Sequence, residues 1–491
     1  MKEQRAHSLY RLSDARLLRE QAYVNGRWTA ADDLSVVEVR DPADGDLIGT
    51  VPDMGPRETR AAIEAAAEAF QSWRRTAPEE RTKILRAWAA GMRDAAEDLA
   101  VLMVLEQGKP LKEAQGEIAY AACFLEWFAE RTHEVGRTIE RPAMPGRQTR
   151  VRREPLGVVA AITPWNFPSA MITRKAAAAL AAGCTVVVRP AELTPFSATA
   201  LAELGERAGL PPGVFNVVTG MPHGMIGELT SNPTVRAISF TGSSEIGAKL
   251  LSWSAPTVKK ACMELGGHAP FLVFEDADLE MAADLAVAAK FQTTGQDCLA
   301  VNRFLVHHAI YEPFLERFAE KAAALVVGPG LTPGVDQGPL MNARALTKVD
   351  GHVRDAVRRG ARVMTGGGPH PLGGLFYQPT VLADAHRDML IWYEETFGPA
   401  AAVMPFKDEA AAIAEANDSA YGLAAYVVTN DPDRADRVAD ALDCGMVGVN
   451  CASITGASIP FGGTKRSGLG REGGTVGLEE YTELKYVCSR S

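Results

Sequence analysis

The sequence lacks the features that mark extracellular, membrane-spanning and metal-binding proteins. Its 491 residues contain seven cysteines and no CxxC pair, which argues against a disulfide framework and against a zinc or other metal site. The longest apolar run, from Ala176 to Val188, is shorter than the roughly 18–20 residues that span a bilayer. Residues 1–19 are charged and have no apolar segment typical of a secretory signal. We therefore expect a cytoplasmic protein with reduced cysteines and no membrane partner.

Positive charge is also scarce. The chain has 51 Lys and Arg against 61 Asp and Glu, a net charge of −10, whereas a nucleic-acid-binding protein needs a basic surface. We therefore expect no nucleic-acid partner, although an acidic protein can still bind a small anion at a locally positive site. The hydrophobic fraction of 47% is ordinary for a globular protein, and the length predicts about two to four domains.

Periodicity along the chain predicts an α/β fold. Apolar residues recur at helical spacing from Thr59 to Glu134, and from Leu156 onward short apolar runs alternate with helical segments. This alternation is typical of a parallel sheet covered on both faces, and its continuation beyond Asp276 predicts a second such sheet. The predicted strands are 157–162, 185–188, 214–218, 237–240, 259–264, 271–274, 304–306, 361–364 and 401–405, and the predicted helices are 170–182, 195–208, 221–229 and one from Ser244.

Residues 136–154 differ in character from their surroundings. They contain six arginines around two prolines and a glycine, and we predict an exposed β-hairpin with its turn at Met144–Gly146. Such a hairpin is compatible with a subunit contact and, equally, with a solvated basic hairpin that has no partner.

One glycine motif is misleading. Residues Gly468 to Gly473 fit the dinucleotide pattern G-x-G-x-x-G, but the residues before them are polar and basic rather than an apolar strand. Only 18 residues follow Gly473, too few for the rest of a nucleotide-binding half. We therefore interpret this segment as a glycine-rich loop that packs near the C-terminus.

A better nucleotide signal lies between Ile238 and Gly247. An apolar strand runs into a Gly–Ser turn, and the N–H groups at the start of the next helix could face a pyrophosphate. An ordinary helix cap is equally compatible with this segment alone. Arg189 and Glu192 follow the strand-like run Val186–Val188, at the sheet edge where such ligands bind. Arg189 supplies a cation there, and Glu192 supplies a carboxylate suited to ribose hydroxyls.

Three further segments suggest a catalytic centre, although each is weak alone. Glu264 ends an apolar strand before two glycines, Cys298 follows a glycine-containing loop, and Asn166 lies on a proline-bounded turn. We expect all three to follow strand ends. Together they suit one reaction: a thiolate attacks a carbonyl, an amide and a backbone N–H stabilise the oxyanion, and a carboxylate activates water.

The sequence with these three segments resembles the aldehyde dehydrogenase superfamily and, within it, the succinate-semialdehyde dehydrogenase-like group. The resemblance spans nearly the whole chain, from Tyr23 to Cys488. The motifs that carry it are PWNFP at 164–168, FTGSSEIG at 240–247, ELGG at 264–267, GQDC at 295–298, EETFGP at 394–399 and PFGG at 460–463.

The resemblance implies a role for each matching residue. Cys298 is implied as the nucleophile, Asn166 with the Cys298 N–H as the oxyanion hole, and Glu264 as the base that hydrolyses a thioester intermediate. Ser243 would contact the pyrophosphate, Glu395 the nicotinamide ribose and Phe397 the nicotinamide. The residues expected to bind NAD, with NADP as the alternative, are Thr163, Pro164, Trp165, Arg189, Glu192, Gly242, Ser243, Gly247, Leu265, Gly266, Glu395 and Phe397.

The family fold also implies a domain plan. It predicts a Rossmann-like dinucleotide-binding domain of residues 1–135 and 155–265, and a catalytic α/β domain of residues 266–466. Residues 136–154 and 467–491 would form a β-hairpin oligomerisation element, so we expect a homodimer or a homotetramer.

Two departures from the family pattern concern charge. Arg189 stands where lysine is usual, and Arg could help to hold a 2′-phosphate, but Glu192 would repel one, so we favour NAD over NADP. Asp297 replaces a neutral residue before the nucleophile. A carboxylate that faced the thiol would raise the thiol pKa, and we expect the Asp297 side chain to point away and pair elsewhere.

A third departure concerns the substrate. The semialdehyde group holds the substrate carboxylate with two arginines and a hydroxyl; Arg174 matches the first arginine, but Gln292 stands at the second. The hydroxyl falls near Thr455 or Gly456, and Phe461 completes the expected substrate-binding set. Ala300 occupies the position of the group's redox-switch cysteine. Because glutamine lacks the charge and the two-pronged fork of arginine, we predict weak turnover of succinate semialdehyde and a longer or less charged aldehyde as substrate.

Other functions fit parts of the pattern. A CoA-acylating aldehyde dehydrogenase is disfavoured by Glu264, because a base that activates water favours hydrolysis. A cofactor-independent cysteine thioester or ester hydrolase is disfavoured by Glu192, Ser243 and Glu395, and a non-catalytic homologue by the retention of Asn166, Glu264 and Cys298.

Overall fold

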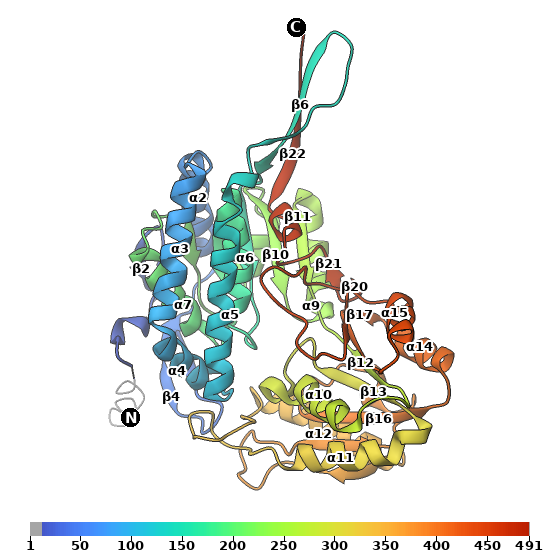
Figure 1. Cartoon of the computed structure of the whole chain (residues 1–491). Helices are drawn as coiled ribbons and strands as arrows, with labels where there is room; N and C mark the ends of the chain where they lie inside the picture. The colour runs from blue at the N-terminus through green and yellow to red at the C-terminus, as the bar shows by residue number, and fades with distance from the viewer. Residues whose placement is uncertain (1–11, 491) are drawn as a thin grey trace.

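Apolar strands separated by alanine-rich helices form two open sheets, from which an arm of antiparallel strands extends (Figure 1). The computed structural model describes residues 12–490, so the first part of the charged segment at residues 1–19, and the two ends of the predicted domain plan, lie outside the described residues. Within residues 12–490, no helix is both long and apolar enough to cross a membrane.

The first sheet has eight strands in the order β2-β1-β9-β8-β7-β10-β11-β21. Its five central strands are parallel. The chain runs outward from β7 through β8 to β9 and then returns to β10 on the other side of β7, so the carboxyl ends of β7 and β10 form the topological switch point. The strands are β1 (Ala22–Val24), β2 (Arg27–Thr29), β7 (Val158–Ile162), β8 (Thr185–Arg189), β9 (Phe215–Val217), β10 (Val235–Thr241), β11 (Lys260–Glu264) and β21 (Gly468–Leu469).

Helices cover both faces of this sheet because successive strand side chains point to opposite sides. In β7, Val159 and Ala161 join one apolar cluster, whereas Val158, Ala160 and Ile162 join another. The helices of the first face are α3 (Pro78–Asp94), α4 (Ala96–Gln107), α5 (Leu111–Ala129), α6 (Ala170–Ala182) and α7 (Pro195–Arg207), and those of the second are α2 (Pro56–Trp73), α8 (Met225–Ser231) and α9 (Ser244–Ser254).

The second sheet has seven strands in the order β14-β15-β16-β13-β12-β18-β19, all parallel except the edge strand β14. They are β12 (Ala269–Val273), β13 (Val301–His307), β14 (Arg362–Thr365), β15 (Thr380–Ala383), β16 (Ala400–Phe406), β18 (Ala424–Val428) and β19 (Met446–Val449). Its covering helices are α10 (Leu279–Phe291) and α11 (Tyr311–Ala323) on one face and α12 (Ala343–Arg358), α14 (Glu409–Asn417) and α15 (Pro432–Ala441) on the other.

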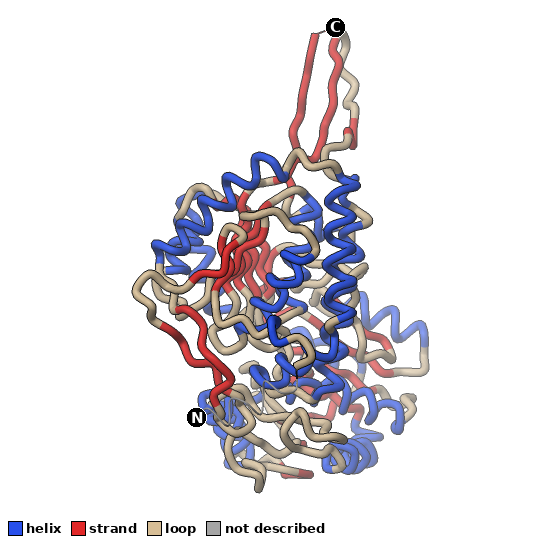
Figure 2. The backbone as a smooth tube through the Cα atoms, turned by 90° about the vertical axis from the view of Figure 1, so that its left-hand side faces the viewer, coloured by secondary structure: helices blue, strands red, loops and turns tan. Residues whose placement is uncertain are grey.

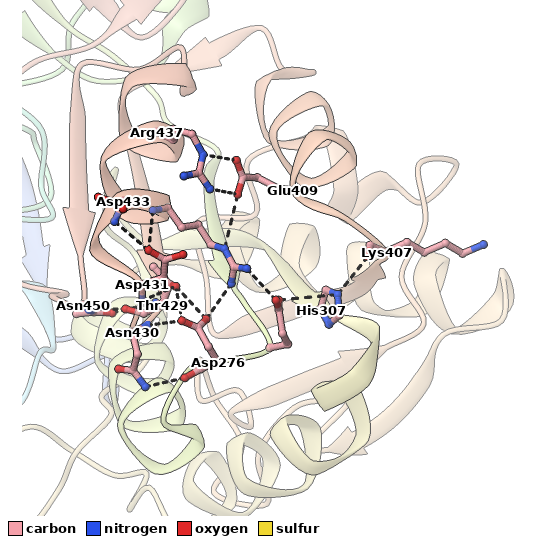
Figure 3. Close-up of polar contacts among 12 residues, drawn as sticks. Asp276, His307, Lys407, Glu409, Thr429, Asn430, Asp431, Asp433, Arg437 and Asn450 are labelled. Carbon is pink, nitrogen blue, oxygen red and sulfur yellow. Dashed lines mark hydrogen bonds and ion pairs between the residues drawn. The ribbon is translucent and has the colours of Figure 1, made fainter.

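Side chains of opposite charge join the carboxyl ends of the second sheet (Figure 3). Arg434 of α15 donates to Glu275 Oε1 at 2.8 Å and to Asp276 Oδ1 at 3.0 Å, just after β12. Asp276 also accepts hydrogen bonds from Thr429 and Asn430, which follow β18. Open α/β sheets usually bind ligands at this edge, but here it is filled by protein side chains.

The arm is a three-stranded antiparallel sheet in the order β22-β6-β5 that projects away from both α/β units (Figures 1 and 2). It consists of β5 (Thr138–Glu140), β6 (Arg147–Pro155) and β22 (Thr482–Arg490). The predicted hairpin is therefore present, but its longest ladder joins β6 to the C-terminal strand β22 rather than to β5.

The prediction of an α/β fold with two parallel sheets is confirmed, with corrections in detail. The helix predicted at 221–229 begins only at Met225, because Gly224 before it has φ +80°. The strands β15, β18 and β19 are not predicted by the sequence pattern, nor is the antiparallel pair β3 (Val36–Arg40) and β4 (Leu47–Pro52).

Candidate active site

The catalytic candidates meet where the carboxyl edge of the first sheet faces the amino edge of the second. Glu264 is the last residue of β11, and a Cβ atom on the following Gly267 would lie 2.2 Å from the carbonyl oxygen of Cys298. Cys298 itself lies just before β13, not after a strand as expected. It reaches the site because the two sheets present opposite ends of their strands to each other.

Glu264 and Cys298 lie against each other. Glu264 is 2% exposed, and its Oε1 has no hydrogen-bond partner among residues 12–490. Its carboxyl contacts the thiol of Cys298, which stays partly exposed. The Glu264 backbone pairs with Thr241 of β10 on one side and with Gly468 of β21 on the other, so its position is fixed from both sides.

Asn166 approaches the nucleophile from the end of β7. Its Nδ2 donates to the Gln296 carbonyl at 3.0 Å, and its own carbonyl accepts a hydrogen bond of 2.8 Å from the amine of Lys109. Lys109 is ion-paired with Glu117 at 2.6 Å, and Glu117 also accepts from the N–H of Ser169 before α6. This buried pair fixes the PWNFP turn, and the sequence analysis did not identify it.

Burial and neighbouring charge raise the pKa of both reacting groups. Burial is the main reason that the pKa of Glu264 is raised to about 8; the nearby Glu472 raises it further, and Arg174 and Lys175 oppose the shift. Burial likewise raises the pKa of the Cys298 thiol well above its usual value, with additional contributions from Glu264 and Asp297. The resting thiol is therefore protonated at neutral pH, and Glu264, once deprotonated, lies in position to receive its proton.

Asp297 only partly meets the expectation that it points away. Its Oδ1 accepts a hydrogen bond of 3.0 Å from the Leu299 N–H, as a side chain paired elsewhere would. Its carboxylate nevertheless contacts Cys298 and raises the thiol pKa. The expected separation is therefore wrong, because a side chain that turns back to cap Leu299 stays beside the intervening residue.

A buried ion-pair cluster lies behind Glu264. The Lys175 amine contacts Glu472 closely and donates to Thr241 Oγ1 at 2.7 Å, and Arg174 lies 3.5 Å from the same Glu472 carboxylate. Glu472 belongs to the glycine motif 468–473, for which a loop is predicted, but its first two residues form the edge strand β21 of the first sheet. The residues around Glu472 do not indicate that its carboxylate is part of a buried ion pair, because its partners are almost 300 residues away in the sequence.

The carboxyl edge of the first sheet offers fitting groups for a dinucleotide. Thr163 Oγ1 after β7 is buried without a hydrogen-bond partner, and Ser243 caps α9 beside the switch point. A Cβ atom on Gly247 would lie 2.4 Å from Leu265, so glycine is required for this close packing of helix and strand. Gly242 and Pro164 lie in the turns after β10 and β7.

The loop before β16 of the second sheet approaches this edge and would face the nicotinamide end of a dinucleotide. Glu395 Oε1 accepts from the Gly267 N–H at 2.9 Å, and Glu395 Oε2 lies close to Gly266. The ring of Phe397 stands at right angles to that of Trp165, with centroids 5.6 Å apart. Burial raises the pKa of Glu395 to about 7. The donor and acceptor set therefore fits a dinucleotide.

The Arg189 guanidinium already has hydrogen-bond partners within the chain. Its Nη2 donates to Glu192 Oε2 at 2.8 Å and to the Gly220 carbonyl at 3.1 Å, and its Nε is buried without a partner. The Glu192 carboxylate, which is still partly exposed, is the group that remains available for ribose hydroxyls.

The substrate candidates do not all come together. The Arg174 guanidinium lies 4.1 Å from the Phe461 ring centroid and donates to Tyr120 Oη at 2.7 Å, and its charge acts on Glu264 and Cys298. Gln292 is exposed at the end of α10. Thr455 is half-buried in the loop before Phe461. The sequence did not reveal Tyr120 as a partner of Arg174.

Comparisons with known proteins agree with this geometry. Residues 28–487 match the model of the aldehyde dehydrogenase family. The chain is 52% identical to glutarate-semialdehyde dehydrogenase of Pseudomonas aeruginosa, over 97% of this chain and 99% of that protein. It is also 52% identical to the NADP-dependent succinate-semialdehyde dehydrogenase of Escherichia coli, with the same coverage of each chain. A crystal structure of an E. coli NADP-dependent enzyme is similar with a TM-score of 0.96 at 52% identity, covering 98% of this chain and 100% of that one.

Proposed function

Because the chain belongs to the aldehyde dehydrogenase family, we propose that Cys298, Glu264 and Asn166 carry out the reaction of that family at the junction of the two sheets. The chain is an NAD(P)-dependent oxidoreductase that converts an aldehyde into the carboxylic acid. The observation that supports these residue roles best is the unpaired Glu264 carboxyl oxygen beside the Cys298 thiol.

The proposed first step is thiol addition. Glu264 takes the proton of Cys298, and the thiolate adds to the aldehyde carbon to give a thiohemiacetal. Asn166 Nδ2 and the Cys298 N–H donate to the oxyanion, and Asn166 exchanges its bond to the Gln296 carbonyl for this one. When bound, NAD(P) supplies the hydride acceptor that converts the thiohemiacetal into a thioester.

The proposed second step is hydrolysis. Glu264, deprotonated again, removes a proton from water, and the hydroxyl adds to the thioester carbonyl. Collapse breaks the carbon–sulfur bond, releases the acid and regenerates the Cys298 thiolate. Because Glu264 Oε1 has no hydrogen-bond partner among the described residues, this oxygen is free to act on a proton in both steps.

The test follows NADH absorbance with an aldehyde panel, with and without CoA, on the wild type and on Cys298→Ala. We expect NADH formation by the wild type without CoA and its loss in Cys298→Ala. NADH formation by Cys298→Ala at the wild-type rate would show that another residue is the nucleophile. A requirement for CoA would favour acyl transfer, and hydrolysis without any NADH would favour a thioester hydrolase.

We further propose that the substrate is a semialdehyde longer than succinate semialdehyde, or a less charged aldehyde. Arg174 supports a carboxylate near the thiol, and Gln292 in place of a second arginine supports weaker selection for the carboxylate of a short semialdehyde. Gln292→Arg should then raise kcat/KM for succinate semialdehyde at least about 10-fold relative to neutral aldehydes, since a charged bidentate hydrogen bond replaces a neutral one. Wild-type kcat/KM for succinate semialdehyde above that for all longer aldehydes would contradict the proposal.

Cofactor preference and assembly are also proposals. The Glu192 carboxylate supports NAD over NADP, and Glu192→Gln should therefore lower KM for NADP while raising KM for NAD. The projecting arm supports a homodimer or homotetramer. The cytoplasmic location expected from the sequence stays a prediction.

A further inference from the structure

The loop that carries the nucleophile contains an unusual stretch of backbone. Thr293 and Thr294, shortly before Cys298, both have left-handed conformations, with φ of 50° and 60°. β-Branched residues rarely adopt this region because the side chain crowds the backbone, and two in succession are rarer still. Both threonines are buried at 1% exposure. The surrounding structure must therefore hold this conformation in place.

A single carboxylate holds the first of the two threonines. Glu113, in the first turn of α5, accepts from the Thr293 N–H at 3.0 Å and 3.2 Å through its two oxygens. It also accepts from Thr293 Oγ1 at 3.3 Å. Thr294 is held differently, because its Oγ1 donates to the Gly338 carbonyl at 3.1 Å. Glu113 therefore reaches the nucleophile loop from the first α/β unit.

The same loop fixes the groups around the sulfur. The Gln296 carbonyl accepts the hydrogen bond from Asn166 at 3.0 Å, and Gln296 Oε1 accepts from the Met341 N–H at 2.9 Å. A relaxation of Thr293 to an ordinary conformation would rotate the chain between α10 and Cys298. It would thereby move both Gln296 and the thiol relative to Asn166.

We propose that Glu113 is a positioning residue that holds the left-handed Thr293–Thr294 turn and so fixes the Cys298 thiol against Asn166 and Glu264. Glu113 acts through the backbone and does not touch the substrate. The inference rests on the proposed role of Cys298 and adds a residue from the opposite α/β unit to that machinery.

The test is a rescue experiment on the full chain. Glu113→Ala should lower kcat/KM for the aldehyde at least 10-fold and leave KM for NAD within about 2-fold. Thr293→Gly in the Glu113→Ala background should raise kcat/KM at least 3-fold above that of Glu113→Ala alone, because glycine adopts a positive φ without side-chain crowding. Thr294→Gly in the same background is the matched control and should recover nothing, since Glu113 does not hold Thr294. Lys112→Ala, an exposed neighbour on α5, should behave as the wild type.

The possible outcomes either support or overturn the positioning role of Glu113. Wild-type kcat/KM in Glu113→Ala, or equal recovery by Thr293→Gly and Thr294→Gly, would overturn the inference. If Glu113→Ala does not fold, Glu113→Gln with and without Thr293→Gly makes the same comparison, because glutamine keeps the side-chain length and loses the charge. Activity that survives Cys298→Ala would instead overturn the proposed function, so the two failures are distinguishable.

Discussion

At the scale of single residues, the protonation state of Glu264 sets the pH dependence of hydrolysis. A base works when deprotonated, and the pKa of Glu264 is raised to about 8. The rate of thioester hydrolysis should therefore rise with pH through about 8 and level off above it. Rapid-mixing measurements of the deacylation rate from pH 6 to 10 would give the midpoint.

Glu472→Gln tests the origin of this shift. Removal of the Glu472 charge leaves Arg174 and Lys175, which both lower the pKa of Glu264, so the rising limb should move to lower pH by about one unit. Glu480→Gln is the control, since Glu480 pairs with Lys260 at 3.6 Å and is not among the main charges that shift the Glu264 pKa. An unchanged midpoint in Glu472→Gln would mean that burial alone sets the pKa.

The sequence predicts only part of the site at this scale. Glu264 and Asn166 follow strands of one parallel sheet, so their meeting at its carboxyl edge could be expected. The contacts of Glu113 with Thr293 and of Lys175 with Glu472 could not, because they join residues 180 and 297 positions apart. No local pattern records which distant side chain will satisfy a buried charge.

At the scale of secondary-structure elements, Arg434 links α15 to the ends of β12. Its side chain is 19% exposed, pairs with Glu275 and Asp276, and stacks on Phe274 at 4.8 Å. Arg434→Leu should lower the free energy of unfolding by about 1–3 kcal/mol, because two carboxylates lose their charged donor. Urea unfolding curves would measure the loss.

A neighbouring arginine supplies the matched control. Arg437 is 56% exposed and pairs with Glu409 alone, so Arg437→Leu should cost less than about 1 kcal/mol. Equal losses in the two variants would show that the carboxyl-edge network contributes no more than an ordinary surface ion pair. Catalysis should be unaffected in both, since this edge lies at the opposite end of the strands from Cys298.

Elements differ in how well the sequence predicts them. The strands β7 and β8 are continuous apolar runs bounded by turns, as expected for strands buried on both faces. The strands β18 and β19 are short and contain alanine or glycine, so their apolar pattern is weak and only neighbouring strands define them.

At the scale of the whole molecule, the arm presents apolar side chains that nothing within residues 12–490 covers. Leu484 and Tyr486, two residues apart on β22, are 60% and 52% exposed on one face of the arm. If they form the proposed subunit contact, Leu484→Glu with Tyr486→Glu should yield particles of single-chain mass by light scattering, because charge replaces apolar contact area.

The control for the arm lies on the same strand. Glu483 points to the other face of the strand, so Glu483→Gln should leave the particle mass unchanged. A doubly substituted chain of unchanged mass would exclude this face of the arm from the interface.

The interleaving of the two sheets along the chain has a consequence for synthesis. β1 lies near the start of the chain and β21 near its end, yet both belong to the first sheet, so all strands of the second sheet are made in between. A ribosome delivers residues from the N-terminus onward. A chain released before Gly468 contains the Cys298 thiol but lacks Glu472, and Lys175 and Arg174 are left without their countercharge. Such a product should misfold and be degraded rather than persist as a free reactive thiol.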